Sequence, residues 1–208
     1  MGGVFLYQTI RRVLFCLLLT AILWTAFLIT DREKLTDSLI RFHVIANSDS
    51  DEDQQIKLKV RDAVLSGIQE DLASVSDVSE ARAYLEENLP KIRDIVRKTL
   101  NDCGVDVKSN VSLCRERFHA RHYETFSLPA GVYDSLKIMI GEAEGRNWWC
   151  VAFPTLCLPA TTDGFEAAAA GAGFSSSIVR SLTKKDGISI QFYLLDWLGE
   201  LENIFFQG

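Results

Sequence analysis

Three histidines have the widest chemical range in this sequence, because imidazole binds metal ions and transfers protons near neutral pH. They are His43, His119 and His122. The last two lie three residues apart, a spacing that puts both side chains on one face of a helix and could begin a zinc site. Three arginines lie among and beside them and would repel a cation, so we expect no metal there. A hydrolase or a metal-dependent enzyme that uses these histidines therefore stays an alternative to a function without catalysis.

The acidic stretch around residue 50 invites comparison with a calcium site. Asp49, Asp51 and Asp53 alternate like the first ligands of an EF-hand loop. Such a loop needs glycine at its sixth position and a bidentate glutamate at its twelfth, where this chain has Gln54 and Val60. We therefore interpret the stretch as a helix N-terminus, where carboxylates face exposed backbone amides.

Cysteine chemistry depends on the compartment, because disulfides persist in exported proteins. Of the five cysteines, Cys16 lies in an apolar N-terminal segment, and the others are Cys103, Cys114, Cys150 and Cys157. Four cysteines allow three pairings. We predict Cys103 with Cys114 and Cys150 with Cys157, because a short turn could bridge each pair; the other pairings and free thiols stay open. A disulfide is a simpler reading than a cysteine nucleophile paired with His43, so we expect no catalytic residue.

An aromatic run, GRNWWCVAFPTLC at residues 145–157, holds two adjacent tryptophans. On an extended strand, Trp148 and Trp149 point to opposite faces, so one core cannot take both. An exposed tryptophan beside Phe153 has the composition of a protein-interface anchor or a membrane-surface contact. Burial of the second tryptophan under another segment is the alternative reading.

The periodicity of apolar residues predicts an α+β fold. Residues 39–46 alternate like a half-buried strand, and Ser50 with Asp53 resembles a cap for a helix to about residue 72. A second helix spans about 77–100, and Pro90 must kink it or begin a new segment after Asn88. Strands follow near 105–113, 136–140 and 148–153, and a last strand at 188–194, alone or passing into a short helix at 195–198, closes the domain. We thus expect two long helices packed on a mainly antiparallel sheet.

The N-terminal region contains a candidate membrane helix. Val13 to Ile29 is uncharged over 17 residues, which as a helix would extend about 26 Å, just long enough to cross a bilayer. Arg11 and Arg12 precede it and a charge-balanced segment follows, so the positive-inside rule places the N-terminus in the cytoplasm. We expect a signal or anchor helix, with an uncleaved anchor favoured because the flanking residues suit a signal peptidase poorly.

The chain then divides into three parts: residues 1–30, an exported domain at 31–201, and a tail at 202–208. All 28 acidic residues and 20 of the 22 basic ones follow residue 30, so the remainder has a net charge of −8 and suits nucleic acid poorly. The tail, ENIFFQG, resembles the recognition sequence of tobacco etch virus protease, although Ile204 and Phe205 depart from its usual residues.

Two longer stretches resemble stage II sporulation protein R of endospore-forming bacteria. They are LIRFHVIANSDSDEDQQIKLKVRDAV at 39–64 and LPAGVYDSLKIMIGEAEGRNWWCVAFPTLC at 128–157, and the similar order of elements extends over most of residues 38–198. Thr155 stands where the family usually doubles a proline, Cys103 and Cys114 look like additions, and residues 166–177 replace what is often a charged segment. The motifs are long and unusual in composition, so the resemblance is specific.

The resemblance implies a signalling protein made in the forespore and exported into the space between two membranes. There it would trigger a membrane-bound aspartic protease of the mother cell to process the precursor of sigma factor E. We expect no cofactor and no small-molecule substrate. The residues that we expect to contact the protease are Trp148, Trp149, Phe153 and Asn147, with Arg41, His43, Asn47 and Asp49 as a second surface.

Overall fold

The computed structural model describes residues 2–75, 77–123, 126–154, 179, 182–183 and 190–206. In chain order its elements are α1 (Gly2–Asp37), β1 (Ile40–Ile45), α2 (Asp51–Ala73), α3 (Val78–Glu87), α4 (Leu89–Asp102), β2 (Ser109–Phe118), β3 (Arg121–His122), β4 (Ser127–Leu128), β5 (Gly131–Ile140), β6 (Asn147–Phe153) and α7 (Ile190–Phe205). The α+β class predicted from periodicity is confirmed. Residues 166–177 and Cys157 lie outside the described residues.

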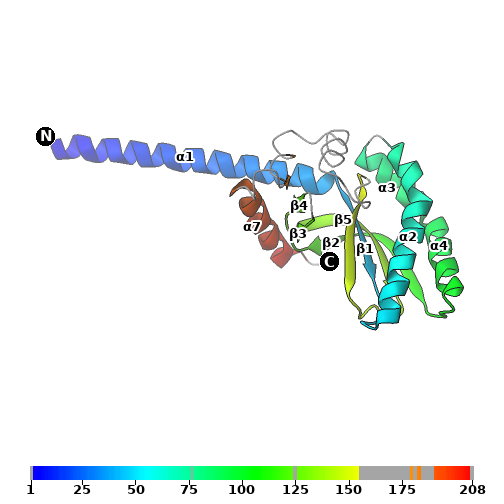
Figure 1. Ribbon diagram of the computed structural model, residues 1–208. Coiled ribbons are helices and arrows are strands. Elements are labelled where there is room, and N and C mark those ends of the chain that lie inside the picture. Colours follow the sequence, from blue (N-terminus) through cyan, green and yellow to red (C-terminus); the bar gives the residue numbers. More distant parts are fainter. Residues whose placement is uncertain are drawn as a thin grey trace.

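A four-stranded sheet in the order β2-β5-β1-β6 forms the centre of the domain, as Figure 1 shows. The outer pairs, β2 with β5 and β1 with β6, are antiparallel, whereas the central pair of β1 and β5 is parallel. The sheet is therefore mixed: two of its three pairs are antiparallel, as in the mainly antiparallel sheet that we expected, but the central pair is parallel. The segment between β1 and β5 includes three helices, which is the kind of long crossover that a parallel pair requires.

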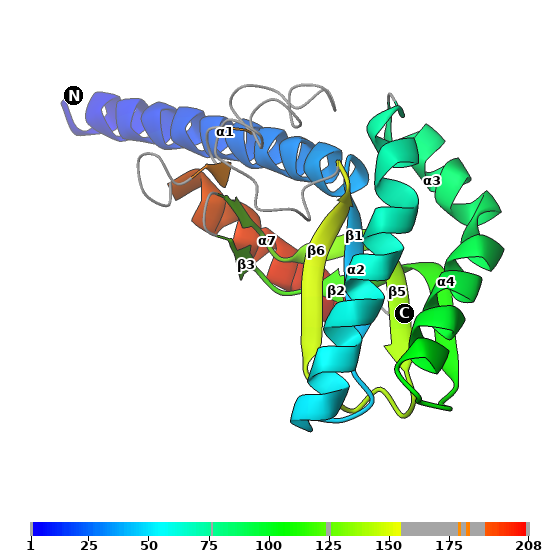
Figure 2. The same cartoon turned by 45° about the vertical axis from the view of Figure 1, so that its right-hand side comes forward.

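Helices α2, α3 and α4 lie on one face of this sheet (Figure 2). Ser50 caps α2 by accepting a hydrogen bond from the Asp53 backbone amide at 3.2 Å, as its sequence predicted. The second predicted helix is two helices, since α3 ends at Glu87 and α4 begins at Leu89 with Pro90 in its first turn, where the missing amide costs nothing. Three helices rather than two cover this face.

The second face of the sheet is covered at one end by the last turns of α1 and by α7. Leu35, Tyr133 and Phe192 belong to the apolar cluster that joins them to the sheet. Residues 190–194 are helical, so the strand predicted at 188–194 is wrong over its described part. The exposed side of α7 is itself apolar, which hid the helical period in the sequence.

Helix α1 projects from the domain along most of its length, as Figure 1 shows. Its stretch Tyr7–Asp37 is long enough to cross a membrane and contains an apolar window of 18 residues, whose side chains are exposed, so it is not a core helix. The helix continues without a break into the domain, where Leu35 is fully buried. At the other end of the chain, Glu202 pairs with Arg32, and Asn203 donates to the Phe118 carbonyl at 3.0 Å, so part of the predicted tail contacts the domain.

Candidate functional site on the second face of the sheet

Polar side chains meet on the second face of the sheet, where the strand register places three of them in one row and side chains from neighbouring rows reach it. Lys137 of β5 lies opposite His43 of β1, and His43 lies opposite Trp149 of β6. The Glu116 side chain of β2 reaches the His43 ring, and Asn147, opposite Ile45, lies two residue pairs further along β6 on the same face. We call these five residues, His43, Glu116, Lys137, Asn147 and Trp149, the His43 cluster.

The imidazole of His43 is held by two partners. Its Nδ1 lies 3.0 Å from Oε1 of Glu116, and its Nε2 lies 3.0 Å from Oδ1 of Asn147. Both ring nitrogens thus have a side-chain hydrogen-bond partner. The side chain is almost wholly buried, so these contacts fix its orientation.

Glu116 links the histidine to a lysine. Its second oxygen accepts from Lys137 Nζ at 2.9 Å. Burial alone would raise the pKa of this carboxyl group, but hydrogen bonds from His43 and Lys137 outweigh it and lower the pKa to about 2. Glu116 is therefore a stable anion that positions the His43 and Lys137 side chains, not a proton donor at neutral pH.

Trp149 gives the cluster its aromatic surface. Its ring stacks on the His43 imidazole with centroids 3.7 Å apart, and the Arg121 guanidinium lies 5.1 Å from its centroid. Trp149 is half-buried, whereas Asn147 and Arg121 are exposed. The cluster thus has a buried base and a rim that reaches solvent, as expected of an interface anchor rather than of a core.

Arg41 extends the same face beneath the part that α7 covers. It is fully buried, its Nε donates to the Cys150 carbonyl at 3.2 Å, and its Nη2 donates to the Tyr123 hydroxyl at 3.2 Å. Its guanidinium also lies 4.3 Å from the centroid of Phe118. Arg41 is therefore bound within the protein and supports the floor of the face.

This arrangement gives little support to catalysis. Each histidine has a different partner: His43 as above, His119 with Glu200 at 2.9 Å, and His122 with Ser127 at 2.9 Å. Across the described ranges, no three His, Cys, Asp or Glu side chains converge as metal ligands. Burial, and then the charge of Glu116, raise the pKa of the Cys114 thiol, the opposite of what a nucleophile needs.

Comparison with known proteins assigns the chain to a family. A family profile described as stage II sporulation protein R matches residues 36–163. The chain belongs to the stage II sporulation protein R family. It is 31% identical over 185 residues to stage II sporulation protein R of Bacillus subtilis, covering 80% of this chain and 83% of that protein. No solved structure matches the chain.

The match to the stage II sporulation protein R family includes every strand that forms the His43 cluster. Of the residues that we expected to contact a partner, the structure brings His43, Asn147 and Trp149 together, and Arg41 lies two residues before His43 on the same face of β1. Trp148 lies on the other face, where its ring meets Phe42 edge-on and the Arg61 guanidinium at 4.8 Å. The two tryptophans thus point to opposite faces, and neither is fully exposed.

Phe153, Asn47 and Asp49 lie away from the cluster. Phe153 is only 5% exposed and packs in the core under the helices, so it offers no surface to a partner. Asn47 donates to Asp53 at 2.9 Å and accepts from the Glu142 amide at 3.1 Å. Asp49 accepts from the Arg146 amide at 2.6 Å. Asn47 and Asp49 therefore join the turn after β1 to the turn before β6.

The predicted disulfides are absent from the described part of this family member. Cys103, Cys114 and Cys150 are free thiols. The pairing of Cys103 with Cys114 is not formed because the two residues lie on opposite sides of a contact between α4 and β2. At this contact Arg93 of α4 donates to the Val111 carbonyl of β2. Cys103 is ten residues further along α4, about 15 Å away, and Cys114 is three residues in the opposite direction, about 10 Å away.

Sequence reasoning missed three members of this surface: Glu116, Lys137 and Arg121. In sequence they stand among ordinary surface charges, and the strand that carries Glu116 also carries arginines. The available signal was alternation, because Lys137 interrupts the apolar run of β5 at the position that faces away from the helices. Only the sheet register, however, brings it beside His43.

Proposed function

We propose that this chain is an exported sporulation signal that activates a membrane-bound aspartic protease of the mother cell, which then processes the precursor of sigma factor E. Membership of the stage II sporulation protein R family supports a signalling role in sporulation. The exposed apolar helix α1 supports export across the forespore membrane, with anchoring by the uncleaved helix. The domain then lies in the space between the two membranes.

We further propose that the His43 cluster engages the extracytoplasmic part of the protease. The observation that carries this proposal is the rim of the cluster, where half-buried Trp149 and exposed Asn147 lie over a fixed network of charges. A buried charged network costs desolvation and is a poor source of stability, so its presence on an accessible face favours recognition. Aromatic anchors of this kind are frequent hot spots in interfaces.

The experiment measures processing of the sigma factor precursor in cells that contain the matching protease, the precursor and this chain. We expect processing to depend on the chain and to be lost with Trp149→Ala, because truncating an anchor typically costs about 2 kcal/mol or more of binding. Trp148→Ala is the matched control, since it removes the same side chain from the opposite face. Its processing should stay close to that of the unchanged protein.

Trp149 also packs on Phe118, so its loss could disturb folding. Asn147→Lys avoids this difficulty, because Asn147 is exposed and its side chain, among the described residues, hydrogen-bonds to His43 alone. The proposal predicts that this variant accumulates normally and signals poorly. Full processing with both Trp149→Ala and Asn147→Lys would show that the cluster is not the contact surface, whereas processing without this chain would contradict the signalling function itself.

A further inference from the structure

Helix α7 carries an exposed apolar stripe that the domain does not use. Tyr193, Trp197 and Ile204 are 59%, 60% and 71% exposed, and half-buried Leu201 lies between them. Spacings of four, eight and eleven residues place all four on one side of a helix. The opposite side carries Phe192, Leu195 and Asn203, which are buried against the domain. The stripe therefore contributes little to folding, and in water it would be an unfavourable surface.

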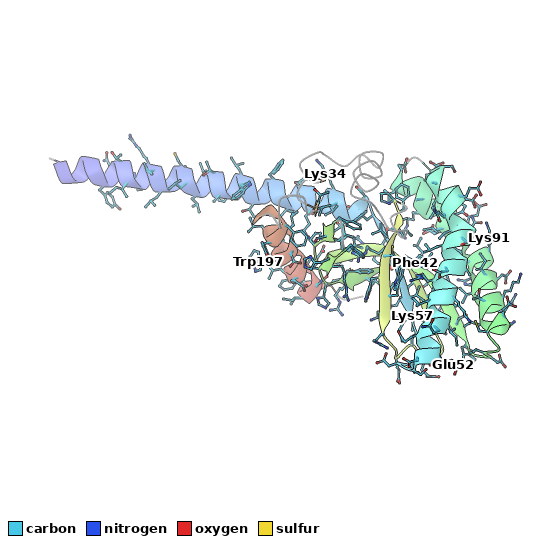
Figure 3. The ribbon with its side chains drawn as sticks, viewed as in Figure 1. Lys34, Phe42, Glu52, Lys57, Lys91 and Trp197 are labelled. Atoms are coloured by element: carbon cyan, nitrogen blue, oxygen red, sulfur yellow. The ribbon has the colours of Figure 1, made fainter. Side chains whose placement is uncertain are left out.

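The stripe lies beside the point where α1 leaves the domain. Arg32 of α1 pairs with Glu202 of α7, and the two helices lie side by side in both views (Figures 1 and 2). Figure 3 places Trp197 on the side of α7 that faces away from the sheet, on the side toward which α1 projects. The stripe thus continues the exposed apolar surface of α1.

The depth of α1 in a bilayer fixes the level of α7. If Arg11 and Arg12 mark the cytoplasmic boundary, a hydrocarbon core about 30 Å thick ends about 20 residues later. That boundary falls near Arg32, the residue that Glu202 binds. Helix α7 is therefore held at the outer surface of the membrane, at the depth where tryptophan and tyrosine are enriched in membrane proteins.

We infer that the outer surface of the lipid bilayer covers the stripe Tyr193, Trp197, Leu201 and Ile204, so that α7 is an interfacial helix and a second attachment beside α1. The inference rests on α1 lying in the membrane, as in the proposed function. Two attachments would fix the orientation of the domain relative to the membrane. Strand β1 begins just after α1, and its far end, Ile45, lies opposite Asn147. The two attachments hold the His43 cluster at a set height above the membrane.

Tryptophan fluorescence in vesicles tests this position. The full-length chain is reconstituted in phosphatidylcholine vesicles whose acyl chains carry bromine either near the headgroup or near the bilayer centre, since bromine quenches only nearby tryptophans. Trp24→Phe, Trp197→Phe and Trp148→Phe are compared, the last being the matched control on the sheet. We expect Trp197→Phe to remove most of the shallow quenching, Trp24→Phe to remove the deep quenching, and Trp148→Phe to change neither.

The outcomes separate the two attachments. Deep quenching that depends on Trp24, with shallow quenching that is indifferent to Trp197, would overturn the inference and leave α1 as the sole anchor. The stripe would then be free for a second copy or another membrane protein. If the reconstituted chain shows no deep quenching that depends on Trp24, both the membrane anchor and the inference are overturned. Because the readout involves no protease, failure of the proposed contact surface would leave it unchanged.

Discussion

The two faces of one sheet use the same strands for opposite purposes. On the face under α2 and α4, β1 presents Phe42 and Val44, which are fully buried among apolar side chains. On the other face, β1 presents Arg41 and His43, which are just as buried but are bound by hydrogen bonds and aromatic rings. Apolar packing is non-directional and stabilises wherever area is lost, whereas the polar face requires specific partners. The comparison teaches that one face is held together by apolar packing and the other by specific polar partners.

The largest expected effect tests this division on neighbouring residues of β1. Phe42→Ala should lower the free energy of unfolding by about 3–5 kcal/mol, because it leaves a cavity in the core beneath the helices. His43→Ala, on the other face, should cost about 1–3 kcal/mol, because it removes two hydrogen-bonded contacts from a network near solvent. Urea unfolding of the full chain in detergent measures both. Equal costs would show that the faces share stability evenly.

The second prediction concerns acid stability, which the polar face should control. The folded-state pKa of Glu116 is about 2, against an ordinary value of 4.5. Its ionised form therefore stabilises the fold in full at pH values above 4.5. This contribution should disappear as the pH falls from about 4.5 to about 2. Glu116→Gln should cost about 1.5–3 kcal/mol at pH 7, and its unfolding free energy should vary less with pH in that window. Parallel pH curves for the two proteins would contradict the role given to Glu116.

Local patterns predicted the helix-covered face well. The cap at Ser50, the apolar positions of α2 and the interruption before Pro90 follow from spacing and backbone chemistry within a few residues. Adjacent tryptophans on opposite faces follow from strand geometry in the same way. These features depend on neighbours in sequence, which a single sequence displays.

The polar face was predictable only in part. Arg41 and His43 alternate with apolar residues, which predicted a half-buried strand, yet both are buried because other strands supply their partners. The parallel pairing of β1 with β5 depends on tertiary packing, so no local signal placed Lys137 beside His43. In α7, the buried positions include Gly199 and Asn203 while Trp197 is exposed, so its hydrophobic pattern does not report burial.

The third prediction tests how α7 closes one end of the polar face. A Cβ added at Gly199 would overlap the carbonyl group of Ala130, a backbone atom pair that cannot rotate away. Gly199→Ala should therefore displace α7 and cost about 1–3 kcal/mol. Gly67→Ala in α2 is the matched control, because its Cβ would meet only the end of the Ile95 side chain, which can turn aside. That substitution should be neutral or stabilise by up to about 1 kcal/mol, since alanine favours helix over glycine.

Hydrogen exchange distinguishes displacement of α7 from general weakening. In Gly199→Ala, the amides of α7 should exchange faster while those of α2 and β5 keep their protection, because the apolar face remains intact. Uniform loss of protection would mean that α7 and the sheet unfold as one unit. Identical behaviour of the Gly199 and Gly67 variants would show that α7 is not seated on Ala130. Helix α7 would then not cover its end of the polar face, and that face would be accessible along the whole of β1.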